Sequence, residues 1–106
     1  MHRRWMERRD VDVVLRIDGS WAEDELVQTM RRRNVIGYVA EDEDEAVTGF
    51  VIYELHCDGL EILRLRGSLE ARELLLDYLV TEKLSRSNRR RWLRLDVDER
   101  DLGAQL

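Results

Sequence analysis

Three consecutive segments in the middle of the chain carry the residues of β-strands, and they restrict the fold more than any other feature. Residues 35–40 and 46–56 are rich in β-branched and aromatic side chains, which favour strands. Between them, the five carboxylates of residues 41–45 are too charged to be buried. A turn at residues 57–59 leads into a third apolar segment, residues 60–65. The sequence therefore predicts three antiparallel strands, the first two joined by an acidic tip.

The region before this sheet has helical periodicity. Residues 3–6 predict a short strand, and Asp10 lies where an N-cap would start a helix. Ser20 and Glu23 match a capping box, which predicts a second helix with an apolar stripe on one side. Asn34 is expected to end that helix region in a left-handed turn. Two helices therefore precede the three antiparallel strands.

The region after the sheet predicts one more helix and one more strand. Ser68 is placed to cap a long helix over residues 69–84, whose broad apolar face predicts deep burial. Residues 92–97 alternate as a final strand, which makes a right-handed parallel crossover with the strand before the helix. Gly49 predicts a bulge or a close backbone approach. The predicted fold is α+β with a mixed sheet in the order β-α-α-β-β-β-α-β.

Length and composition indicate one small acidic domain. Its 106 residues, taken as a single domain over residues 1–106, suffice for a hydrophobic core. The formal net charge of -5 argues against general nucleic-acid binding. No apolar run approaches the roughly 20 residues that a membrane helix needs, and no signal-peptide core is present, so a cytoplasmic protein is expected. The single cysteine, Cys57, and the two histidines have no partners at metal-site spacing, and we expect no metal.

Three stretches of the sequence together resemble a known superfamily. Residues 5–10, 32–41 and 47–55 are similar to the GNAT acetyltransferases, and most similar to the ribosomal-protein-alanine N-acetyltransferases among them. The resemblance extends over nearly the whole chain and is most specific between Asn34 and His56. It implies a GNAT-like mixed sheet and the transfer of an acetyl group from acetyl-CoA to an amine of a protein, a peptide or a small molecule.

The resemblance implies a loop that holds the diphosphate of acetyl-CoA between the fourth strand and the long helix. In the superfamily a glycine-rich run supplies backbone amides and a helix N-terminus there. Here Gly67 matches the first glycine, Leu69 stands in place of the second, and Glu70 adds a carboxylate where an anion would bind. Arg66 is the arginine expected to contact the coenzyme. The candidate cofactor-binding residues are Leu65, Arg66, Gly67, Ser68 and Leu69.

The resemblance also implies a general base and a general acid. Asp96 aligns with the glutamate of a family L-E-V triplet and is the candidate catalytic base. The alternative for this residue is a solvated carboxylate paired with Arg94. The general acid of the superfamily is a tyrosine beyond an N-x-x-A motif. Residues 101–104 match the motif with aspartate in place of asparagine, but no tyrosine follows before Leu106. The superfamily's last helix and strands are expected to be missing, which predicts a C-terminally truncated GNAT-like fold.

These departures leave two functions open. The first is a domain related to N-acetyltransferases, with acetyl transfer as the implied chemistry. The alternative is a non-catalytic pseudoenzyme, in which the same fold serves as a binding or dimerisation module. Because a shortened sheet would expose its final strand, a homodimer through this C-terminal edge is expected. The arginine runs at residues 31–33 and 86–91 are more simply helix-end and solvated charges than an RNA-binding surface.

Overall fold

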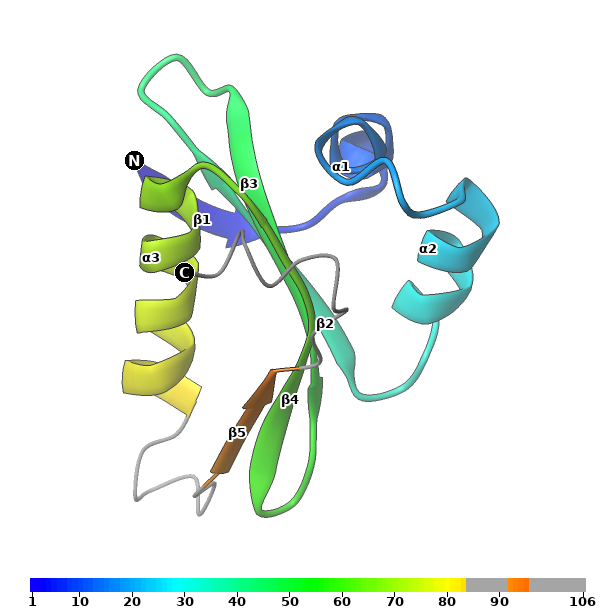
Figure 1. The fold of residues 1–106 in the computed structure, drawn as a ribbon, viewed down its shortest axis with the longest axis vertical. Helices are drawn as coiled ribbons and strands as arrows, with labels where there is room; N and C mark the ends of the chain where they lie inside the picture. The colour runs from blue at the N-terminus through cyan, green and yellow to red at the C-terminus, as the bar shows by residue number, and fades with distance from the viewer. Residues whose placement is uncertain (84–91, 96–106) are drawn as a thin grey trace.

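One mixed sheet with helices on both faces forms the described part of the chain (Figure 1). The computed structural model describes residues 1–83 and 92–95. The strands are β1 His2–Trp5, β2 Val35–Glu41, β3 Val47–Leu55, β4 Gly59–Gly67 and β5 Trp92–Leu95. The helical elements are η1 Arg8–Asp10, α1 Val11–Ile17, α2 Glu23–Met30, α3 Leu69–Tyr78 and the π-helical turn η2 Leu79–Lys83. None of these helices is long and apolar enough to cross a membrane.

The strands follow one another across the sheet in the order β1-β2-β3-β4-β5. The first four strands pair antiparallel with their neighbours, and β5 pairs parallel to β4. Parallel pairing of consecutive strands needs a crossover connection, which contains α3. The mixed α+β fold class, the two hairpins and the parallel final strand predicted from the sequence are therefore confirmed.

Two hydrophobic clusters lie on opposite faces of the sheet, because successive side chains of a strand alternate between its faces. Along β3, Val51 and Tyr53 join the cluster under α3, whereas Phe50 and Ile52 join the cluster under α1 and α2. All four side chains are fully buried. In Figure 1, α1 and α2 lie on one side of the sheet and α3 on the other, so the helices cover both clusters.

Arg4 of β1 connects β1, β2 and the first helical segment. Its guanidinium donates two hydrogen bonds of 2.8 Å to the carboxylate of Asp10, and its Nε lies 3.1 Å from Oε1 of Glu41. Glu41 is the last residue of β2 and is only 7% exposed. The prediction that it is too charged to be buried was therefore wrong, because Arg4 supplies the opposite charge that a buried carboxylate requires.

Asp10 has a different role from the predicted N-cap. Its backbone is helical, and its side chain makes no capping bond to α1. Instead, Oδ2 of Asp10 accepts a 2.7 Å hydrogen bond from the backbone N–H of Glu7, which belongs to a capping box for η1. Desolvation acts to raise the pKa of Asp10, but the hydrogen bonds from Arg4 and from the Glu7 N–H outweigh it. The pKa of this carboxyl is lowered overall.

The capping box predicted at Ser20 and Glu23 does not form. α2 begins at Glu23, and its N-cap side chain makes no capping bond. The hydroxyl of Ser20 donates instead to Oδ1 of Asp18 at 2.5 Å, since a nearby carboxylate competes with the backbone for such a group. The left-handed turn predicted at Asn34 was also wrong: among the described non-glycine residues, only Glu45 has a positive φ.

Gly49 and Gly67 pack backbone against backbone where β3 meets the end of β4. A Cβ on Gly49 would lie 2.5 Å from the Cβ of Ala71, and a Cβ on Gly67 would lie 2.4 Å from the Cα of Gly49. Gly67 also has a φ of +124°, which L side chains rarely adopt. The close backbone approach predicted at Gly49 is confirmed. This contact lets α3 start directly after β4 and pack close to the sheet.

Candidate functional site

Strand β4 changes register halfway along its length. Ile52 of β3 pairs with Arg64, whereas Tyr53 pairs with Ile62, so Leu63 is an extra residue that forms a β-bulge. Ile62 packs in the cluster under α3, and Leu63 packs in the cluster under α1 and α2. The bulge therefore resets the alternation, and Arg64 points to the face covered by α1 and α2.

The bulge comes directly after the last β4 residue that pairs with the described residues of β5. The described residues of β5 pair with Gly59 to Ile62, and the last pair joins Ile62 to Leu95. Figure 1 shows the described part of β5 beside the first part of β4. From Leu63 to Gly67, β4 pairs on one side only within the described part of the chain, with β3. Residues 63–67, which have no strand partner on that side among the described residues, are called the free edge of β4, and a strand edge can bind an extended ligand through backbone N–H and C=O groups.

A charged cluster lies beside the free edge of β4. Asp18 follows α1, is 6% exposed, and has its Oδ2 3.5 Å from the Nε atoms of both Arg64 and Arg66. Trp21 lies against Arg64, with the guanidinium carbon 4.7 Å from the ring centroid. Two guanidinium groups share this one carboxylate. The cluster therefore brings two arginines and one buried carboxylate together on the face covered by α1 and α2.

Several polar groups of the β4–α3 junction are hydrogen-bonded to other residues of the protein. Ser68 caps α3 as predicted, since its hydroxyl accepts a 3.1 Å hydrogen bond from the N–H of Ala71. The backbone N–H of Ser68 donates to the carbonyl of Thr48 at 3.0 Å. By helix geometry, the N–H groups of Leu69 and Glu70 have no carbonyl partner within α3. These two amides are the backbone N–H donors of the first turn of α3 that can bind an anion.

The predicted cofactor-binding residues lie together at the end of β4 and the start of α3, but they do not share one face. Leu65 packs against the cluster under α3, and Arg66 lies on the opposite face beside Asp18. Gly67 is required by its contact with the backbone of β3, and Leu69 is 62% exposed. The candidate base Asp96 lies outside the described residues, as does the motif at residues 101–104.

The sequence patterns did not identify Asp18, Trp21 and Arg64 as members of this site. The alternation Arg64-Leu65-Arg66 was the available signal, because it places two arginines on one face of a strand. Which face they occupy depends on the bulge at Leu63, and that bulge follows from pairing with β3 rather than from any local sequence pattern.

Replacing Ser68 tests the cap at this junction. We expect Ser68→Ala to lower the free energy of unfolding by about 1 kcal/mol, because the N–H of Ala71 then loses its capping acceptor. Ser68→Gly should cost only a few tenths of a kcal/mol, since glycine is tolerated at an N-cap. Urea denaturation of the three proteins measures both values. Equal losses in the two variants would contradict the capping role.

A second polar cluster lies at the hairpin between β3 and β4. Possible ligand atoms of Glu54, His56 and Glu61 lie within 4.8 Å of one another, because Glu54 pairs across the ladder with Glu61. Sequence spacing did not reveal this arrangement. Nη2 of Arg32 lies 2.7 Å from Oε2 of Glu54, and Nη2 of Arg94 lies 2.8 Å from Oε1 of Glu61. The hydrogen bond from Arg94 is the main reason that the pKa of Glu61 is lowered. These arginines already neutralise both carboxylates, which disfavours a cation here.

Comparison with known proteins finds similarity in structure only. No protein-family profile matches the sequence, and no curated protein matches it. A mutant of the BH1408 protein from Bacillus halodurans matches with a TM-score of 0.80 at 12% identity, over 99% of this chain and 87% of that chain. An acetyltransferase from Trypanosoma brucei matches with a TM-score of 0.67 at 16% identity, over 97% of this chain and 87% of that chain. A ribosomal-protein-alanine N-acetyltransferase from Brucella melitensis biovar Abortus 2308 matches with a TM-score of 0.69 at 15% identity, over 99% of this chain and 90% of that chain.

These matches cover nearly all of the chain and include proteins named as acetyltransferases with several different acceptors. At such low identity they show the fold. The chain has the fold of the GNAT acetyltransferases, and the resemblance inferred from its sequence is confirmed at this level.

Proposed function

We propose that this chain is a GNAT-type N-acetyltransferase domain that binds acetyl-CoA along the free edge of β4. The observation that carries the proposal is the bulge at Leu63, which turns Arg64 and Arg66 to the face of the sheet covered by α1 and α2, beside Asp18. Bulges are common beside active sites, where they redirect side chains and end strand pairing. The acetyltransferases that share this fold support the same chemistry by analogy.

Acetyl-CoA has the chemistry to fit this edge. Its pantetheine arm is an extended chain with amide groups, and a free strand edge binds such a chain through backbone hydrogen bonds. Its phosphates are anionic, and the guanidinium group of an arginine such as Arg64 can bind them through paired hydrogen bonds. The first turn of α3, directly after Gly67, adds the positive end of a helix dipole.

Acetyl transfer needs a neutral amine as the nucleophile. The amine nitrogen attacks the thioester carbonyl, a base takes the proton from the nitrogen, the C–S bond breaks and coenzyme A leaves as the thiolate. We assign the base to Asp96. It is the next residue after Leu95, which pairs with Ile62 immediately before the bulge.

The β4–α3 junction favours a second candidate function, a non-catalytic binding module. The N–H of Ser68 is engaged by Thr48, and the carboxylate of Glu70 lies in the first turn of α3. Both features weaken an anion site, because fewer amides remain for the phosphates and the added charge has the wrong sign. In this function the fold would serve for association rather than catalysis.

We also propose that association occurs through the edge of β5. This strand ends the sheet order, and among the described residues it pairs with β4 alone. A second copy of the chain that pairs there would cover the exposed backbone groups. Light scattering at micromolar concentration should give the mass of a dimer. The mass of a monomer would contradict the proposal.

The activity itself is tested by the thiol released from acetyl-CoA in the presence of a panel of primary amines. We expect Arg66→Ala and Arg64→Ala each to raise the KM for acetyl-CoA about tenfold, the effect of losing one charged contact. Arg33→Ala, which removes the same charge from an exposed position, is the control and should change KM by less than about twofold. Unchanged KM values in both site variants would contradict the proposed coenzyme site.

A further inference from the structure

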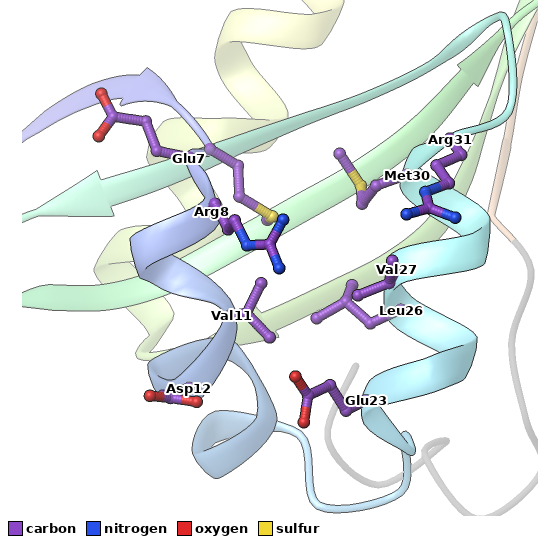
Figure 2. A pocket seen from close by; sticks show the side chains of 10 residues that line it. Glu7, Arg8, Val11, Asp12, Glu23, Leu26, Val27, Met30 and Arg31 are labelled. Carbon is purple, nitrogen blue, oxygen red and sulfur yellow. The ribbon is translucent and has the colours of Figure 1, made fainter.

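A cleft of about 550 Å³ lies between the first helical segment and α2 (Figure 2). Its apolar floor is formed by Met6, Val11, Leu26, Val27 and Met30. The other lining residues are all charged: Glu7, Arg8, Asp12, Glu23 and Arg31. None of the lining residues belongs to β4 or to the segment at residues 18–22 that contacts it. The cleft is therefore separate from the proposed acetyl-CoA site.

Two arginines face each other across this cleft. Figure 2 shows the guanidinium groups of Arg8 and Arg31 extending into the space from opposite sides. Neither guanidinium has an ion pair or hydrogen bond with another residue in the described ranges 1–83 and 92–95. By contrast, Arg4, Arg9 and Arg32 all have carboxylate partners. Two positive charges on opposite sides of an apolar floor attract an anion into the space between them.

The acidic residues make the charge of the cleft differ between its two ends. In Figure 2 the carboxylate of Glu23 points into the space, whereas Glu7 and Asp12 turn their carboxylates away from its centre. Glu23 is the first residue of α2 and Arg31 is its C-cap, so opposite charges stand at the two ends of one helix. An anionic group is attracted to the arginine end and repelled from the Glu23 end.

We propose that this cleft binds an aliphatic carboxylate, with the head group between Arg8 and Arg31 and the chain on the apolar floor. Guanidinium groups bind carboxylates through pairs of parallel hydrogen bonds. Met6 and Met30 have unbranched, adaptable side chains that suit an alkyl chain. Their terminal methyl carbons both lie near Gly37, at 3.1 and 3.0 Å from where its Cβ would stand. Among the ten described residues that line the cleft, none has a neutral hydrogen-bonding side chain, which favours a ligand whose body is entirely apolar.

The methionines make this proposal directly measurable. The chain has three methionines, and two of them, Met6 and Met30, line the cleft. Protein labelled with ¹³C at the methionine methyl groups is titrated with octanoate at millimolar concentrations. We expect saturable shifts of the Met6 and Met30 signals and none at Met1, which serves as the internal control. Octylamine, with the same chain and the opposite charge, should bind at least tenfold more weakly.

Variants separate the role of charge from general hydrophobic binding. Arg8→Gln combined with Arg31→Gln should weaken octanoate binding at least tenfold, whereas Glu23→Gln should leave it unchanged or strengthen it. Methyl shifts of the free variants that match the native protein would establish that the fold is intact. The proposal is overturned if octanoate does not shift Met6 and Met30, if octylamine binds as tightly, or if the double variant keeps full affinity. This readout is independent of acetyl-CoA binding, so either proposal can fail alone.

Discussion

Gly67→Ala should lower the free energy of unfolding by about 3 kcal/mol, one of the two largest effects expected of a single substitution in this chain. The new Cβ would lie 2.4 Å from both the Cα of Gly49 and the carbonyl oxygen of Thr48. Both are backbone atoms, which cannot move aside as a flexible side chain does. The φ of +124° adds strain for any residue with a Cβ. Because small domains are stable by only about 5–15 kcal/mol, this loss is a large share of the total.

Urea denaturation measures this loss, and Gly19→Ala is the matched control. A Cβ on Gly19 would meet nothing within 4 Å, so this variant should stay within about 0.5 kcal/mol of the native protein. A Gly67→Ala protein as stable as the Gly19→Ala protein would show that the β4–α3 junction is not built on this backbone contact. The result bears on function as well, because it separates the packing role of Gly67 from any role in phosphate binding.

Asp10→Asn should cost about 3 kcal/mol or more, since it leaves the guanidinium of Arg4 without its main charge partner in a largely buried site. The carboxylate of Asp10 is 3% exposed and accepts hydrogen bonds from Arg4 and from the Glu7 N–H. The control is Arg32→Gln, which removes an ion pair whose arginine side chain is 51% exposed. That variant should lose less than about 1 kcal/mol. Similar losses in both variants would contradict a special role for the buried pair.

The Asp10 pair also predicts how stability depends on pH. The pKa of this carboxyl is lowered in the folded protein, so the unfolded chain takes up its proton at a higher pH than the folded chain does. The stabilisation is therefore complete above the unfolded pKa of about 3.9 and is lost as the pH falls through the lower folded pKa. We expect the stability difference between native protein and Asp10→Asn to shrink as the pH is lowered below about 4. A difference that stays constant would contradict this assignment.

Much of the fold was predictable because its signals are local. The strands of the two hairpins carry β-branched residues and are bounded by turn residues, and Ser68 lies immediately before a helical periodicity. Features that depend on distant partners were not predictable. Glu41 is buried only because Arg4, far away in the sequence, reaches it across the sheet. The capping box at Ser20 matched its pattern but failed, because Asp18 binds the hydroxyl.

The candidate site, like the fold, was predictable where its signals are local and not where it depends on distant partners. Its position at the end of β4 followed from the resemblance of residues 34–56 and from the junction that includes Gly67. Its charge could not be derived, because the face on which Arg64 and Arg66 lie is set by the bulge at Leu63 in the pairing with β3. The cleft between the first helical segment and α2 arises from helix packing, and no sequence pattern predicts it.

Direct titration with acetyl-CoA tests the central claim, that the free edge of β4 and the start of α3 form a coenzyme site. The backbone amide signals of the ¹⁵N-labelled protein report the binding residue by residue. We expect saturable shifts between Leu63 and Glu70, with Ser20 and Trp21 affected through their contacts with Asp18 and Arg64. Coenzyme A without the acetyl group should shift the same residues. Spectra that stay unchanged at millimolar acetyl-CoA would contradict the claim and leave the fold as a binding module.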